Sequence, residues 1–166
     1  MPLVPSYIKN LSSYKPGLRI DDVKYEKGLD RAIKLASNEN SMGPAPLAIA
    51  AIESAMEKVN RYPDSNGIAL RDKLAKKFNV KIENVIIGAG SEGIMSNILR
   101  TFLLGDDEIV AAANSFIGFR VLANSTGRSI HWVPMKNHHI DLNGIAKKIN
   151  DYTKIIYVAN PDNPMG

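Results

Sequence analysis

Short apolar runs that alternate with helical patterns constrain this chain more than any other feature. Four runs of strand length, rich in β-branched residues, lie at 85–87, 108–112, 129–133 and 154–159. Between them, apolar residues recur every three or four positions, as in amphipathic helices. A strand that is followed by a helix and another strand usually joins a parallel sheet with helices on its faces. We therefore predict an α/β fold with three layers, αβα, around a mostly parallel sheet.

The amino-terminal part of the chain is less regular. Residues 1–43 have weak periodicity and several Pro and Gly, which predicts an irregular arm that packs on another surface. Apolar spacing then predicts helices over about 44–59 and 70–78, separated by a turn-rich stretch at 60–67. Residues 44–166 are the predicted domain.

Composition excludes several classes of function. The chain has no cysteine, so disulfides, thiolate catalysis and Cys-based zinc sites are ruled out. A formal net charge of +4 without a Lys/Arg run argues against a nucleic-acid partner. The first residues lack the pattern of a signal peptide or a membrane span, so we expect a cytoplasmic protein with no membrane partner. His131, His138 and His139 do not form a metal-site pattern, and no metal is expected.

A glycine-containing turn, Gly88-Ala89-Gly90-Ser91-Glu92, joins the first predicted strand to the next helix. Glycines allow close approach of the backbone, and Ser91 is a candidate cap whose hydroxyl, with nearby N–H groups, would bind a phosphate at the positive helix end. The spacing is neither that of a dinucleotide fingerprint nor that of a P-loop. An ordinary strand-to-helix turn without a ligand is the alternative.

Other polar and aromatic groups also stand next to predicted elements. Phe116 follows the second strand, where its ring could stack on a flat heterocycle or belong to the core. The last strand leads into Asn-Pro-Asp-Asn-Pro-Met-Gly at 160–166, which places Asn163 where open α/β sheets bind ligands, unless the segment is only a proline-rich turn. Residues 38–40 crowd Asn, Glu and Asn before a helix, and Tyr62 is either an anion contact or an ordinary surface tyrosine.

Taken in order, these motifs resemble those of the fold-type-I pyridoxal-phosphate aminotransferases, most closely the histidinol-phosphate aminotransferase group. The likeness runs through nearly the whole chain, and the ordered set is more specific than any one motif. Departures from the family's usual residues occur at Ser41, Asn114, Phe119 and Met165. The matching stretches are Tyr14-Lys15-Pro16-Gly17, Leu35 to Asn40, Arg61 to Asp64, Gly88 to Glu92 and Asn160 to Gly166.

The resemblance implies pyridoxal 5′-phosphate as cofactor and a role for each matching residue. Gly90, Ser91 and Glu92 would hold the cofactor phosphate at a helix N-terminus. Phe116 would stack on the pyridine ring, and Asn163 would hydrogen-bond the 3-oxygen of that ring.

The resemblance also implies partners and a reaction. Tyr62 would reach the phosphate bound by the neighbouring subunit of a homodimer, while Tyr14 and Asn38 would line the substrate side. The reaction would transfer an amino group between histidinol phosphate, or a similar amine, and 2-oxoglutarate, within histidine biosynthesis.

Three groups that the family uses lie beyond the positions matched by this chain: the Schiff-base lysine, the aspartate facing the pyridine nitrogen and the carboxylate-binding arginine. We therefore interpret 44–166 as the front part of a pyridoxal-phosphate-binding large domain, truncated at its C-terminal end. No catalytic residue is expected within the chain, and the 166 residues alone should not catalyse transamination. Two alternatives stay open: a nucleotide-binding α/β dehydrogenase domain, which the missing fingerprint disfavours, and a non-catalytic truncated remnant.

Overall fold

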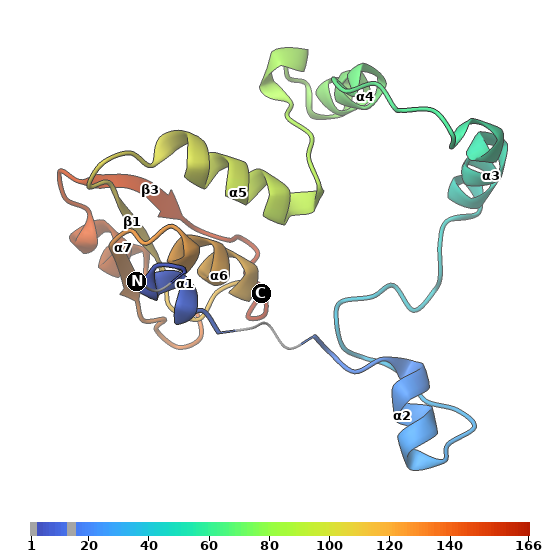
Figure 1. The fold of residues 1–166 in the computed structure, drawn as a ribbon, viewed down its shortest axis with the longest axis horizontal. Helices are drawn as coiled ribbons and strands as arrows, with labels where there is room; N and C mark the ends of the chain where they lie inside the picture. The colour runs from blue at the N-terminus through green and yellow to red at the C-terminus, as the bar shows by residue number, and fades with distance from the viewer. Residues whose placement is uncertain (1–2, 13–15) are drawn as a thin grey trace. The chain divides into compact units, whose positions relative to one another are not determined.

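A computed structural model describes residues 3–12 and 16–166 of the chain. The chain divides into two compact units, one formed by residues 1–14 and 75–166 and the other by residues 15–74 (Figure 1). None of the helices in the described ranges has both the length and the apolarity that crossing a bilayer requires.

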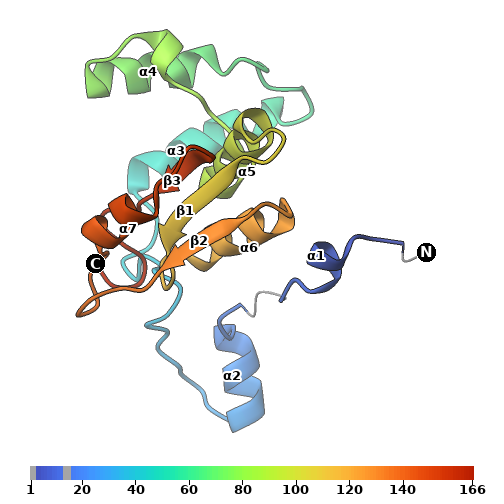
Figure 2. The same cartoon turned by 90° about the vertical axis from the view of Figure 1, so that its left-hand side faces the viewer.

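A parallel sheet of three strands, in the order β2-β1-β3, forms the centre of the first unit (Figure 2). The central strand β1 pairs in parallel with both neighbours, so that Ile109 lies opposite Ile130 on one side and Ile155 on the other. This arrangement confirms the predicted α/β class and parallel sheet. The strands are β1 (Glu108–Ala112), β2 (Ile130–Val133) and β3 (Thr153–Tyr157).

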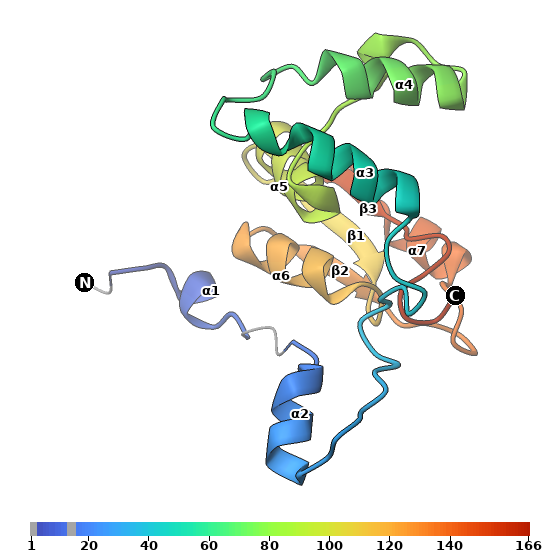
Figure 3. The ribbon, with the colours of Figure 1, turned by 90° about the vertical axis from the view of Figure 1, so that its right-hand side faces the viewer.

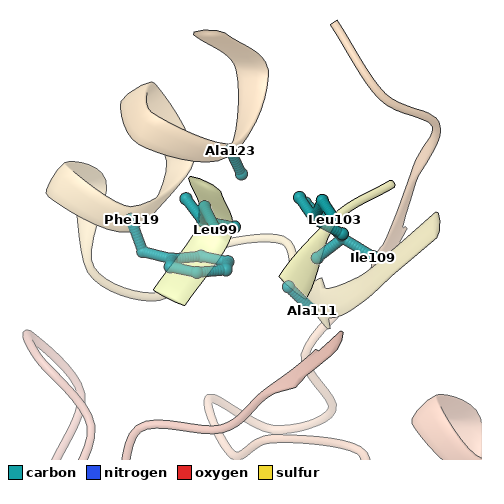
Figure 4. Close-up of a cluster of buried hydrophobic side chains, with 6 residues drawn as sticks. All are labelled: Leu99, Leu103, Ile109, Ala111, Phe119 and Ala123. Atoms are coloured by element: carbon teal, nitrogen blue, oxygen red, sulfur yellow. The ribbon is translucent and has the colours of Figure 1, made fainter. Parts of the chain in front are cut away.

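Helices cover both faces of the sheet. The side chains of β1 after its first residue are apolar and point alternately to opposite sides, so each face needs a helix to bury it. Ile109 and Ala111 pack with residues of α5 and α6 in one cluster (Figure 4). On the other face Val110 packs with Val133 and with Ile145 of α7. Figure 3 shows α5 and α6 on one side of the strands and α7 on the other, which confirms the three layers. The helices are α5 (Gly90–Phe102), α6 (Ile117–Ser125) and α7 (Leu142–Lys148).

Local chemistry accounts for where these helices begin and end. Asp141, a residue type that favours the N-cap position, caps α7: its carboxylate accepts a hydrogen bond from the Gly144 N–H at 2.9 Å. Gly127 follows α6 in the left-handed region, with φ of 69°. The broadly apolar pattern of 94–103 predicts a helix that Gly105 ends, but α5 stops at Phe102 with an extended C-cap, and Gly105 belongs to the next turn.

The first predicted strand, at 85–87, is wrong. The three-stranded sheet in the described part of the chain does not include these residues, and Ile86 is 77% exposed. A strand exists only through hydrogen bonds to a neighbouring strand, and residues 85–87 pair with neither outer edge of the sheet, that of β2 or that of β3. An apolar β-branched run shows a preference for extended backbone but does not supply the pairing.

The remaining elements precede the sheet. Two short helices lie within the predicted arm, and the first of them contacts α6. The predicted helices near 44–59 and 70–78 are present, the former with a 3₁₀ turn at its end. The boundary of the arm at residue 43 stays a prediction. The elements are α1 (Ser6–Lys9), α2 (Ile20–Lys27), α3 (Pro46–Ala55), η1 (Met56–Lys58), α4 (Ile68–Phe78) and η2 (Ile82–Asn84).

Candidate functional site

The loops that follow β1 and β3 meet at the carboxyl edge of the sheet. The two strands are parallel neighbours, so their carboxyl ends lie at the same edge, where α/β sheets bind ligands. The Ser115 hydroxyl donates a hydrogen bond of 2.5 Å to Oδ1 of Asp162, which joins the two loops directly. Phe116 and Asn163 each adjoin one of the bonded residues, so both are brought to this edge, as the sequence predicted.

The loop at 160–166 is held largely by Asp162. Its second carboxylate oxygen accepts from the Met165 N–H at 3.3 Å, and its main-chain oxygen accepts from the Gly166 N–H at 2.8 Å. The Asn160-Pro161 and Asn163-Pro164 peptide bonds are cis. Sequence reasoning assigned no role to Asp162, although a single charged residue in an otherwise neutral Asn/Pro loop was an available signal.

The glycine turn leads directly into α5. The helix begins at Gly90, with Ala89 as N-cap, and no side chain caps its first N–H groups. Ser91 is therefore not the N-cap that the sequence suggested, because the helix starts one residue earlier. Gly90 has φ of 68°, a left-handed conformation that disfavours other residues. A Cβ added to Gly88 would lie 2.8 Å from Cδ1 of Ile94, so this turn also packs tightly.

The start of α5 and the start of α6 converge at Gly118. A Cβ added there would lie 2.6 Å from Oε1 of Glu92 and 2.5 Å from Cε1 of Phe116. Phe116 is the N-cap of α6, and its ring packs in part against the core cluster. A cavity of about 220 Å³ opens at this point, lined by Glu92, Phe116, Ile117, Gly118, Val121 and Leu122. Two predicted cofactor contacts, Glu92 and Phe116, are therefore neighbours.

A stacked aromatic pair lies near these loops. The rings of Phe119 and Tyr157 are stacked, with centroids 3.7 Å apart and planes almost parallel, at 6°. Burial, and then the charge of Asp162, raise the pKa of the Tyr157 hydroxyl above its ordinary value of 10.0. The hydroxyl is therefore neutral at physiological pH.

Three further residues, Tyr62, Asn38 and Tyr14, were predicted to take part in the site. Tyr62 and Asn38 belong to the unit formed by 15–74, and Tyr14 lies outside the described residues. Tyr62 is fully exposed, and Asn38 has a positive φ of 52°. Asn40 stabilises a local turn, with its side chain bonded to Gly43 O and Met42 N, each at 3.0 Å. Ligand roles for Tyr62, Asn38 and Tyr14 stay predictions.

The histidines occupy separate environments. His131 donates from Nε2 to the Glu108 carboxylate at 2.7 Å, at the amino edge of the sheet. His138 and His139 are exposed in the loop before α7. Within the described residues, no group of three or more His, Cys, Asp or Glu side chains is placed to hold a metal ion.

Comparison with known proteins identifies the family. Residues 30–166 match the sequence profile of "Aminotransferase class I and II". The chain belongs to this aminotransferase family. This assignment confirms the resemblance drawn from the motifs and replaces the dehydrogenase alternative.

Individual relatives of this aminotransferase chain agree with the profile. It is 42% identical to a histidinol-phosphate aminotransferase of Anaeromyxobacter sp., covering 100% of this chain and 46% of the relative. It is 40% identical to the corresponding protein of Caldicellulosiruptor saccharolyticus, over 96% of this chain and 44% of that one. The crystal structure of histidinol-phosphate aminotransferase from Sinorhizobium meliloti, in complex with pyridoxal-5′-phosphate, superposes with a TM-score of 0.82 at 25% identity, over 99% of this chain and 44% of that one. The chain thus spans less than half the length of these relatives.

Proposed function

We propose that this chain forms the cofactor-holding front part of a pyridoxal-phosphate-dependent transaminase that acts on histidinol phosphate and 2-oxoglutarate. The observation that carries the proposal is the edge of the sheet where Phe116, Asn163 and the start of α5 gather, in a chain of the aminotransferase family. Histidinol-phosphate aminotransferase is also the name of the relatives described above.

The start of α5 fits the cofactor phosphate. Its first N–H groups have no side-chain cap, and the helix dipole places partial positive charge there. We assign the phosphate to the N–H groups of Gly90, Ser91 and Glu92 and to the Ser91 hydroxyl. The Glu92 carboxylate approaches Gly118 on α6, and like charges repel, so Glu92 contributes its N–H and not its side chain to the phosphate.

The two joined loops fit the pyridine ring. Phe116 would stack on one face of the ring, and Asn163 would donate a hydrogen bond to the 3-oxygen at its edge. When bound, the cofactor supplies an electron sink for charge that develops on the substrate carbon. The residues of this chain bind the ring and orient it.

A nuclear magnetic resonance titration of the ¹⁵N-labelled chain tests the site. Pyridoxine 5′-phosphate is the suitable probe, because it lacks the aldehyde that would react with surface lysines. We expect amide shifts at 90–92, 116 and 163. Ser91→Ala should weaken binding severalfold, the size expected for one hydrogen bond, while the control Ser96→Ala on the same helix should not. Shifts confined to residues elsewhere would overturn the assignment.

The cofactor site is further proposed to be shared in a homodimer. Tyr62 is fully exposed, so its hydroxyl is available to a neighbouring subunit's phosphate, and Tyr14 and Asn38 would face the substrate. In a protein of the relatives' full length, Tyr62→Phe should release cofactor faster on dialysis without changing the oligomeric state. Tyr25→Phe, at a tyrosine that is 91% exposed, is the matched control. Equal cofactor retention in both variants would exclude the Tyr62 contact.

The substrate assignment is tested in the same full-length protein. Glutamate should form from 2-oxoglutarate with histidinol phosphate as amino donor, at a higher kcat/KM than with aromatic amino acids. Activity with aromatic amino acids alone would overturn the assignment of histidinol phosphate as amino donor. It would leave the proposal of a transaminase intact. A cytoplasmic location stays a prediction.

A further inference from the structure

Asp162 combines burial with charge. It is 9% exposed, the one residue with a polar or charged side chain that is buried within the described ranges. An ionised carboxylate loses hydration when it is buried, and hydrogen bonds must compensate for that loss. Here the Ser115 hydroxyl and the Met165 N–H donate to the two carboxylate oxygens.

The two hydrogen bonds differ in what they join. The Met165 N–H lies in the same loop as Asp162, three residues away, and the Gly166 N–H also bonds within that loop. Ser115 is 47 positions away in sequence, in the loop after β1. If the Ser115 hydrogen bond were lost, the turn at 160–166 would keep its internal hydrogen bonds. The direct link between the two loops would be broken.

Each end of this link adjoins a residue with a proposed contact to the cofactor ring. Ser115 precedes Phe116, and Asp162 precedes Asn163. A ring that stacks on Phe116 presents its edge at a set place, and a hydrogen bond from Asn163 weakens steeply if its distance or angle is wrong. The spacing of Phe116 and Asn163 therefore decides whether one ring can satisfy both.

We infer that the Ser115–Asp162 hydrogen bond sets this spacing and makes Asp162 a positioning residue for the hydrogen bond of Asn163 to the ring oxygen, an inference that rests on the proposed function. Asp162 acts through its neighbour and does not itself contact the cofactor. The effect of losing the bond should accordingly depend on whether the ligand carries the 3-oxygen.

Three probes separate this role from general destabilisation. They are pyridoxine 5′-phosphate, its 3-deoxy analogue and inorganic phosphate, each titrated by nuclear magnetic resonance into wild-type chain, Asp162→Ala and Ser115→Ala. Both variants should bind pyridoxine 5′-phosphate about five- to tenfold more weakly, the size expected for one hydrogen bond. The affinity of both variants for the 3-deoxy analogue should differ from that of wild type by less than about twofold, since this analogue has no acceptor for Asn163. Phosphate binding should not change.

Two further variants complete the design. Ser115→Thr keeps the hydroxyl that donates to Asp162 and should bind pyridoxine 5′-phosphate within about twofold of wild type. Asp106→Ala removes an exposed carboxylate from the turn before β1 and should bind all three probes as wild type does. Amide spectra and thermal unfolding of every variant report whether it is folded.

The outcomes distinguish the inference from the proposed function. If wild-type chain does not bind pyridoxine 5′-phosphate at this edge, the proposed site is wrong and the inference is overturned with it. If wild type binds but Asp162→Ala weakens all three probes equally, or none of them, the proposed site stands and the positioning role is overturned. Failure of Ser115→Thr to keep the affinity that Ser115→Ala loses also overturns it.

Discussion

Glu108 begins β1 and accepts hydrogen bonds from the Asn150 amide and the His131 ring. These bonds, Asn150 first, lower the pKa of the Glu108 carboxyl below its ordinary value of 4.5. The folded state then binds fewer protons than the unfolded state, so this stabilisation is present above pH 4.5 and is lost as pH falls through the lower folded pKa. Glu108→Gln should be less stable at neutral pH and should lose less stability on acidification. Urea unfolding between about pH 3 and 5 measures this, with exposed Glu57→Gln as control. Parallel profiles for wild type and Glu108→Gln would contradict the expectation.

Gly118 is a residue at which one methyl group should disturb the candidate site. An alanine Cβ would contact the Phe116 ring at 2.5 Å and the Glu92 carboxylate at 2.6 Å, so both side chains must move. We expect Gly118→Ala to lower the free energy of unfolding by about 1–3 kcal/mol and to weaken binding of pyridoxine 5′-phosphate. Urea unfolding and the titration described above measure the two effects. Wild-type values for both would show that the ring and carboxylate have free space.

Strand β1 is the best-buried element, and its core should be the least tolerant of truncation. Ile109 is 0% exposed between α5, α6 and the neighbouring strands, whereas Ile156 on β3 is 48% exposed. Ile109→Ala should reduce the free energy of unfolding by about 2–5 kcal/mol, because it removes buried surface and leaves a cavity. Ile156→Ala, the same change on an exposed side chain, should cost less than about 1 kcal/mol. Urea unfolding of both variants checks the ranking, and equal losses would contradict the assigned core.

Helix α1 packs near the end of α6, where the Tyr7 ring lies against Gly127, and a substitution at Gly127 tests this contact. A Cβ on Gly127 would meet the ring of Tyr7 at 2.7 Å, and the residue also has a positive φ of 69°. Gly127→Ala should therefore cost more than Gly105→Ala, which has φ of 45° but no atom within 4 Å of the added Cβ. The backbone part of the cost is about 1–2 kcal/mol.

Combining Gly127→Ala with Tyr7→Ala isolates the steric part of that cost. In the Tyr7→Ala background only the backbone penalty should remain, so the two changes should not be additive. Thermal or urea unfolding of the double-mutant cycle measures the difference. Additive losses would mean that α1 does not pack on Gly127 in solution.

At the scale of the whole molecule, the two units should differ in local stability. None of the described residues in 16–74 is buried, and α3 exposes Leu47 at 86% and Ile52 at 63%. Segments with little burial open at low free energy, and thermolysin cleaves beside exposed apolar residues. We expect the first cuts of limited thermolysin digestion, mapped by mass spectrometry, within 16–74 and the last within 108–157. Early cuts in the sheet would contradict this order.

At the candidate site, the sequence predicted which loops take part, but it did not predict the hydrogen bond that joins them. Phe116 and Asn163 were expected at strand ends, and they lie at one edge because β1 and β3 became neighbours. The hydrogen bond between Ser115 and Asp162 spans 47 positions, and no local pattern indicates such a pair. The proposed roles of Gly90, Ser91 and Glu92 still await the binding test, but the start of the helix at Gly90 shows that Ser91 is not its cap.

Local patterns determined the class of fold, because apolar periodicity and turn residues act over a few positions. Residues 108–112, 117–125 and 142–148 took the structures that their own spacing and caps favoured. Tertiary structure decided what depends on distant partners. Residues 85–87 have the composition of a strand, yet they stay outside the described sheet, since a strand requires hydrogen bonds to a distant neighbour and composition does not supply them. Asp162 became a buried link only because the order β2-β1-β3 brought its loop beside Ser115.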